Sequence, residues 1–407
     1  MTDIASGVAK RVAYKVESAW GTPAGTSGAQ ILRRIGSSLA LQKDTYQSAE
    51  IRRDYQVADM RHGVRRVGGA INGELSCGTY KDFLAAAVRQ AWQSAVTSGT
   101  MSNCSASATA PNFVRGSGSF LTAGFKAGDI GRWAGWTTTA TTNNSRNMLI
   151  TAVTATSMNG AFLDGTAIVA KTTGDPVVFT NVGKKTWVPT TGHTDESFSI
   201  EHFHGDLTPA LSELYTGCKL SQLDLGLPPT GLATIGMQFM GKDIVTATSA
   251  YYSNPSAETG SGLLAAVNGA LYVEGQAVAL VTGLNLSING NMNATPVVGS
   301  NTYPGIQEGR VVVTGELSAY FQDASFRDYF LDEAEVGLIV ALTAANTPTA
   351  DCMGIVMPRI KVGGADKSDG EQGIVQRMPF QALLDVNGGS GTDSEQTTVS
   401  FQDSTVT

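Results

Sequence analysis

Short stretches in which apolar and polar residues alternate recur along most of the chain. Such a period of two is typical of β-strands that bury one face. The pattern is found at 223–227, 232–240 and 284–288, and more loosely at 375–384 and 397–401. Turn-forming residues separate these stretches, as in Pro228-Pro229-Thr230-Gly231. The chain is therefore predicted to have a mainly β fold.

One strand–turn–helix pattern occurs twice. Gly73-Glu74-Leu75-Ser76 precedes Thr79-Tyr80-Lys81-Asp82-Phe83-Leu84, and the pair is echoed by Gly315-Glu316-Leu317-Ser318 and Ser325-Phe326-Arg327-Asp328-Tyr329-Phe330. Apolar residues after Thr79 recur at helical spacing, which predicts an amphipathic helix over 80–91. Thr79 and Ser325 are expected to cap the two helices. The repeat indicates a duplicated module with one helix packed on a β layer.

The first copy is interrupted by a long insertion. After a linker of small residues, 97–111, the chain carries short β-rich segments joined by Gly and Asn turns, including 148–156. We therefore predict a first module over 1–111 and 181–253, an inserted small β-barrel or sandwich over 112–180, and a second module over 254–407.

Composition and charge favour a subunit that assembles with copies of itself. Of the 407 residues 42% are hydrophobic and only 15% are charged, so much of the surface is neutral. The net charge of −7 argues against a protein that grips nucleic acid. The loop expected over 44–66, with its counterpart near 291–309, mixes both signs and is the predicted contact between subunits and stacked rings. Its candidate contact residues are Glu50, Arg52, Arg53, Asp54, Asp59, Arg61, Arg65, Arg66, Glu308 and Arg310.

No constellation in the sequence predicts catalysis, a cofactor or a metal site. His202 and His204 would share one face of a strand, but no further ligand is identifiable. The four cysteines are dispersed and are expected to be reduced thiols. Trp133 and Trp136 could stack on sugar rings or pack in a core. A carbohydrate- or host-surface-binding β protein is therefore kept as an alternative, and an enzyme is not expected.

Several segments are similar to one protein family. Ser48-Ala49-Glu50-Ile51-Arg52-Arg53-Asp54, Arg61-His62-Gly63, and Thr234-Ile235-Gly236-Met237-Gln238-Phe239-Met240-Gly241-Lys242 resemble the tail tube proteins of siphophages. The resemblance implies a structural virion protein with a β-sandwich or half-barrel flanked by a helix. Copies of such proteins close into rings that stack into a tube. Since this chain holds two modules, a trimer with pseudo-sixfold symmetry is expected, with a hexamer as the alternative.

The same resemblance implies the partners and the location. The tape measure protein would occupy the lumen during assembly, and tail terminator and tail tip or baseplate proteins would bind the two ends. Genomic DNA would pass through without specific binding, and no membrane would be involved. The protein would assemble in the host cytoplasm and reside in the virion tail. Another tail ring component, such as a terminator or distal tail protein, is the nearer alternative.

Overall fold

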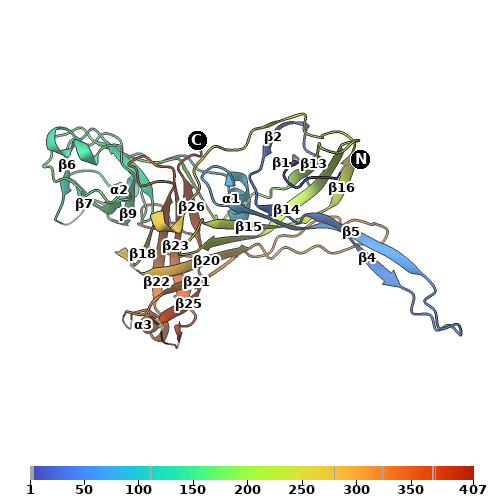
Figure 1. The fold of residues 1–407 in the computed structure, drawn as a ribbon. Coiled ribbons are helices and arrows are strands. Elements are labelled where there is room, and N and C mark those ends of the chain that lie inside the picture. Colours follow the sequence, from blue (N-terminus) through green and yellow to red (C-terminus); the bar gives the residue numbers. More distant parts are fainter. Residues whose placement is uncertain (1–3, 110–111, 279, 323–324, 369–370, 372) are drawn as a thin grey trace.

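The structure is a computed structural model that describes residues 4–109, 112–278, 280–322, 325–368, 371 and 373–407 (Figure 1). Within these residues, twenty strands are linked in one large curved sheet network and six strands form a second, smaller sheet. Helices are few and short. The predicted mainly β fold is thus confirmed.

The first part of the large sheet comes from both sides of the predicted insertion. Before it lie β1 (Lys10–Val16), β2 (Ser27–Ile31), β3 (Gly36–Ser37), β4 (Ala40–Gln47), β5 (Met60–Glu74) and α1 (Lys81–Val88). After it lie β12 (Lys184–Trp187), β13 (Phe198–His204), β14 (Leu211–Leu227), β15 (Thr234–Gly241), β16 (Asp243–Ala247) and β17 (Asn254–Ser256).

The second part of the large sheet follows without interruption. It contains the 3-10 turn η2 (Ala266–Asn268), β18 (Gly269–Val273), β19 (Gln276–Ala277), β20 (Val281–Asn289), β21 (Val312–Tyr320), α3 (Ser325–Leu331), β22 (Glu335–Thr343), β23 (Cys352–Val362), β24 (Asp366–Lys367), β25 (Val375–Ala382) and β26 (Ser400–Asp403).

The smaller sheet lies to one side of the large one (Figure 1). Its strand order is β11-β8-β9-β10-β7-β6. The elements are β6 (Cys104–Ser107), β7 (Asn112–Arg115), α2 (Phe120–Ala123), β8 (Ile130–Ala134), the 3-10 turn η1 (Thr138–Asn143), β9 (Met148–Val153), β10 (Ser157–Phe162) and β11 (Val178–Asn181). The predicted linker over 97–111 is wrong in part, because β6 is an edge strand of this sheet. Residues 110 and 111 lie outside the described part.

The two parts of the large sheet have the same strand order. In the first part β4 pairs with β5, β5 with β15, β15 with β14, and β14 with β13. In the second part β20 pairs with β21, β21 with β25, β25 with β23, and β23 with β22. Strands β14 and β20 pair directly, so the two parts form one continuous sheet. The division into residue ranges made from the sequence stays a prediction.

Strand register shows which residues correspond in the two parts. Phe239 on β15 lies opposite Gly69, and Phe380 on β25 lies opposite Gly315. A Cβ at Gly315 would overlap the Phe380 ring, which explains the glycine there. The sequence repeat aligned Gly315 with Gly73. The strand register shows instead that Gly315 corresponds to Gly69. With this alignment the offset between the two parts is 246 residues both at the strand (315 minus 69) and at the start of the helical pattern (325 minus 79).

Helix α1 covers the apolar face of the large sheet. The Phe83 side chain is fully buried, and its ring centroid lies 4.6 Å from that of Tyr14, 4.8 Å from that of Phe198 and 5.6 Å from that of Phe239. Helix α3 contains no buried residue. The expected cap is wrong for α1: the N-cap is Tyr80, and the Thr79 hydroxyl instead contacts the Ser76 hydroxyl at 2.7 Å.

Loss of the Phe83 ring should destabilise the fold more than loss of its counterpart on α3. Phe83→Ala is expected to lower the free energy of unfolding by about 3–5 kcal/mol, because it leaves a cavity among aromatic rings. Tyr329→Ala, at the corresponding half-buried position, should cost about 1 kcal/mol. Urea denaturation measures both variants, and equal losses would contradict the packing described for α1.

A buried ion pair attaches the small sheet to the large one. The Lys185 ammonium on β12 lies 2.6 Å from the Asp129 carboxylate and 3.3 Å from that of Glu395. Burial alone would lower the pKa of Lys185, but the two carboxylates outweigh it and the pKa is raised. Gln402 adds two hydrogen bonds to the backbone of Ile130, at 2.8 and 2.7 Å. These polar contacts thus help to hold the small sheet to the large one.

Trp133 and Trp136 belong to the core of the small sheet. Their side chains are 0% and 2% exposed, and the Trp133 ring packs between Phe113 and Phe179 at centroid distances of 4.4 and 4.8 Å. Neither indole is available to a ligand. Of the two readings that the sequence left open, the structure supports packing in a core.

Candidate assembly surfaces

One face of the large sheet is apolar and the other is polar. Across six adjacent strands, a buried row runs through Ile71, Met237, Leu223, Ile288, Val313 and Ala382. The neighbouring row on the opposite face runs through Asn72, Gly236, Asp224, Ser287, Thr314 and Gln381. Strand alternation explains this separation, since successive side chains point to opposite faces. We call the second surface the polar face.

The polar face carries few charges, and those at its centre are acidic. A shallow hollow on it is lined by Asn72, Asp224, Asn285, Ser287, Thr314 and Glu316, among others. The Ser287 hydroxyl donates to the Asp224 carboxylate at 2.7 Å, and the Gln222 amide donates to it at 2.8 Å. Arg66 and Arg377 lie toward the margins, on β5 and β25. Such a surface offers no cluster of cations to phosphate groups.

A long hairpin arm, formed by the ends of β4 and β5, projects away from the body (Figure 1). The prediction of a loop over 44–66 is therefore wrong in part. Only 48–59 is a loop, and the rest belongs to β4 and β5. The strand ends of the arm are largely exposed and show no regular alternation of apolar and polar residues, so the sequence did not reveal them. At the arm tip, the Ile51 and Tyr55 side chains are 103% and 99% exposed. Large apolar groups so far from the core indicate a surface that another molecule covers.

The counterpart loop between β20 and β21 packs on the first part of the sheet. Glu308 lies 3.1 Å from the Arg89 guanidinium, and Arg89 also donates to the carbonyl of Gly309 at 2.7 Å. The Arg65 amide donates to the carbonyl of Asn301 at 2.9 Å. This loop thus crosses from its own hairpin onto the neighbouring strands within one chain.

The ten candidate contact residues do not share one surface. Glu50, Arg52, Arg53, Asp54 and Asp59 lie at the arm tip, Arg61, Arg65 and Arg66 lie on β5, and Glu308 and Arg310 lie in the counterpart loop. Several pair within the chain: Arg52 with Asp54 at 2.7 Å, Arg61 with Asp59 at 2.7 Å, Arg65 with Asp243 at 2.6 Å and Arg66 with Asp44 at 2.9 Å. Their role between subunits stays a prediction.

Sequence reasoning singled out the charged residues of the arm but not its apolar ones. Ile51 and Tyr55 stand out only once the strands around them are placed, because isolated apolar residues in a sequence usually belong to a core. The polar face was also missed, since it requires the register of six strands.

A cluster of basic side chains lies in the first part where β1 begins and β13 ends. Its members are Lys10, Arg34, His202 and His204. The His202 ring is buried, lies 3.0 Å from the Ser37 hydroxyl and makes an edge contact with Tyr215. The Nδ1 atom of His204 is buried and has no hydrogen-bond partner.

His202 should make stability depend on pH below neutrality. Burial is the main cause that lowers its pKa from 6.5 to about 3. Because the unfolded side chain takes up a proton first, stability is full above pH 6.5 and falls as the pH drops toward 3. Between pH 7 and pH 5, the free energy of unfolding of His202→Val should therefore fall by about 2 kcal/mol less than that of the wild type. Urea titrations at both pH values test this, and parallel losses would contradict it.

The described residues include no group of three or more His, Cys, Asp and Glu side chains placed to hold a metal ion. All four cysteines, Cys77, Cys104, Cys218 and Cys352, are buried free thiols. Among the described helices, none is long and apolar enough to cross a membrane. The surface features described above are the polar face and the arm.

Comparison with known proteins agrees with these surfaces. A search of curated proteins gives no match. The family model described as phage tail tube protein matches residues 7–382, which is nearly the whole chain and includes both parts of the large sheet except β26. The chain therefore belongs to the phage tail tube protein family and is a structural component of a bacteriophage tail.

Proposed function

We propose that copies of this chain close into rings whose polar faces line a channel, and that the rings stack into the DNA-conducting tube of a long-tailed siphophage. The observation that carries this is the direct pairing of β14 with β20, which joins two parts of equal strand order edge to edge. If the same junction repeats between chains, a closed ring results. A trimer then supplies six repeats and pseudo-sixfold symmetry, and a hexamer remains the alternative.

The polar face suits a channel for DNA. Its central carboxylates and amides repel or ignore phosphate groups, so a genome can slide without being held. The tape measure protein would occupy the same channel during assembly in the host cytoplasm. Terminator and tip or baseplate proteins would bind the two ends of the tube, whose rings each present one free surface.

The exposed arm favours a subunit of a continuous tube over a single-ring component such as a terminator or distal tail protein. Its apolar tip extends beyond the sheet and needs a cover that a neighbouring ring can supply. A carbohydrate-binding role has no comparable support, because Trp133 and Trp136 are buried.

Sedimentation across a concentration series tests the proposal. The purified protein should pass from small species to polymers that lengthen with concentration, because contacts around and along the tube reinforce each other. Single rings that never lengthen would favour the terminator-like alternative, and persistent monomers would contradict ring assembly.

A further inference from the structure

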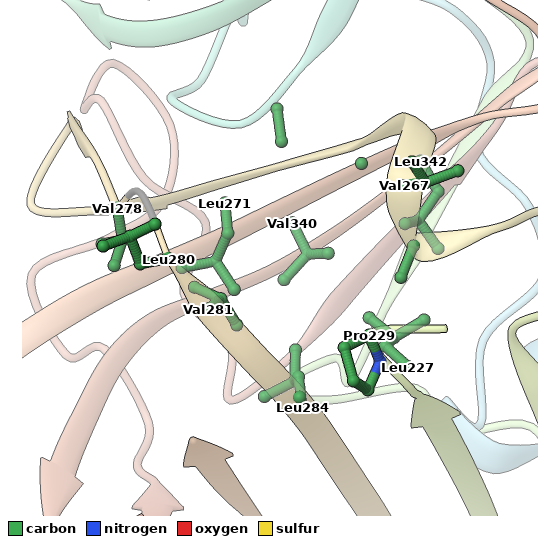
Figure 2. A pocket seen from close by; sticks show the side chains of 14 residues that line it. Leu227, Pro229, Val267, Leu271, Val278, Leu280, Val281, Leu284, Val340 and Leu342 are labelled. Atoms are coloured by element: carbon green, nitrogen blue, oxygen red, sulfur yellow. The ribbon is translucent and has the colours of Figure 1, made fainter. Parts of the chain in front are cut away.

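The junction between β14 and β20 has a defined register. Asp224 lies opposite Ser287 and Leu225 lies opposite Leu286, and both strands have a second partner on their other side. Above this junction, an apolar pocket is lined by Leu227 and Pro229 from the end of β14, and by Val267, Leu280, Val340 and Leu342 from the second part (Figure 2). Both the backbone and the side chains thus hold the two parts together.

Each strand of this junction has a counterpart in the other part. Because Phe380 corresponds to Phe239, Arg377 on β25 corresponds to Gly236 on β15. Asp366 on β24 lies opposite Arg377 and Asp224 lies opposite Gly236, so Asp366 corresponds to Asp224. A bulge interrupts β13–β14 at the same place as β22–β23. The segment 363–368 therefore corresponds to the end of β14.

The counterpart of β20 is the strand formed by β3 and β4. Ala40 lies opposite Gly68 on β5, as Ser287 lies opposite Thr314 on β21. Since Gly69 corresponds to Gly315, Gly68 corresponds to Thr314, and Ala40 therefore corresponds to Ser287.

These two counterparts are free edges within the described residues. Strand β24 pairs only with β25, and β3 and β4 pair only with β5. The Ser368 and Ser38 amides donate to Val375 and Ala70 of their own hairpins, so the amides of Lys367 and Leu39 point outward. Unpaired edges of this kind invite another strand.

We propose that β24 of one copy pairs antiparallel with β3 and β4 of a second copy, with Asp366 opposite Ala40 and Lys367 opposite Leu39. The inference rests on the proposed ring assembly and names its interface. The contact is head to tail, so each copy uses one edge of each kind and the ring closes without a free strand.

Charge complementarity supports this partner. At the positions where the internal pocket has Leu280, Leu342 and Gly269, the free edge of the first part has Arg34, His204 and Lys10. On the other side, the position of Pro229 corresponds to Glu371, which follows β24 in the chain. The apolar side chains of the internal contact thus correspond to the cations Arg34 and Lys10 on one edge and to the carboxylate Glu371 on the other. Complementary charges favour the right partner and disfavour others.

A cysteine pair tests the register in the assembled protein. Ala40 and Asp366 would form a non-hydrogen-bonded pair, with Cα atoms about 4.5 Å apart, within the range that a disulfide spans. The variant Ala40→Cys with Asp366→Cys is assembled, oxidised and run on a denaturing gel without reductant. The matched control is Gln42→Cys with Asp366→Cys, whose positions lie about 7–8 Å apart across the same interface. The native cysteines are buried and give little background.

The matched pair should link chains into covalent multimers at about fivefold or higher yield than the shifted control. Rings or tubes that form while the two pairs link equally would overturn the proposed register and leave ring assembly intact. Monomers in electron micrographs of the reduced variants and of the wild type would overturn both.

Discussion

Replacing Lys367 with proline should strongly weaken assembly while leaving the fold intact. The Lys367 amide points away from its own hairpin, because Ser368 donates to Val375. Proline removes this outward donor and places its ring at the edge where the next copy pairs. Since the same contact recurs at every subunit junction, its loss multiplies around and along the tube. Sedimentation should move the protein from the pellet to the supernatant, with an increase of about tenfold or more in the concentration needed for assembly.

The matched control is Lys367→Ala, which removes the charged side chain and keeps the backbone amide. This variant should assemble like the wild type. Loss of assembly in both variants would show that the side chain matters more than strand pairing. Normal assembly of Lys367→Pro, with unchanged thermal unfolding, would contradict the use of this edge.

Shortening the arm should separate ring formation from stacking. Gln47 lies opposite Met60, so an Asn-Gly turn can replace 48–59 and close the hairpin. The deletion removes the exposed Ile51 and Tyr55 but leaves β3, β24 and the polar face unchanged. We expect single rings in place of tubes, measured by the length distribution in negative-stain micrographs.

A finer variant shows whether the apolar residues are responsible. Ile51→Asn with Tyr55→Asn keeps the arm at full length and should shorten the tubes strongly. Gln56→Asn, at a neighbouring exposed position, is the control and should not. Tubes of normal length from the shortened arm would show that other surfaces carry the stacking.

Much of the fold could be predicted from the alternation of residues along the chain. The strands at 223–227 and 284–288 could be predicted because one face of each is buried and the other faces the solvent side of the sheet. The helix at Phe83 was found for the same reason, and its end was placed too late because the apolar pattern continues past Val88. Local patterns of this kind indicate which face of a segment is buried, but not which strand it pairs with.

Pairing and register could not be predicted in the same way. Gly73 and Gly315 each begin the sequence Gly-Glu-Leu-Ser, yet cross-strand pairing aligns Gly315 with Gly69. The arm was taken for a loop because no face of it is buried, so its strands show no alternation. The polar face and the two free edges depend on which strands are neighbours, which is information that lies far apart in the sequence.

Duplication within one chain gives a physical reason for the differences between the two parts. The junction inside the chain forms together with the fold and is apolar, with Leu227 and Leu280 both lining its pocket (Figure 2). The junction between copies must form after folding, from soluble subunits. Cations such as Arg34 keep that edge hydrated until a partner that carries Glu371 binds.

The most direct test of the account is the rotational symmetry of the assembled particle, determined by cryo-electron microscopy of end-on views. The account predicts closed rings of three copies, with six similar sheet segments around the channel and the polar face turned inward. Rings of six copies would contradict the trimer with pseudo-sixfold symmetry and favour the hexamer. A channel lined by the apolar face or by clustered Lys and Arg would contradict the central claim.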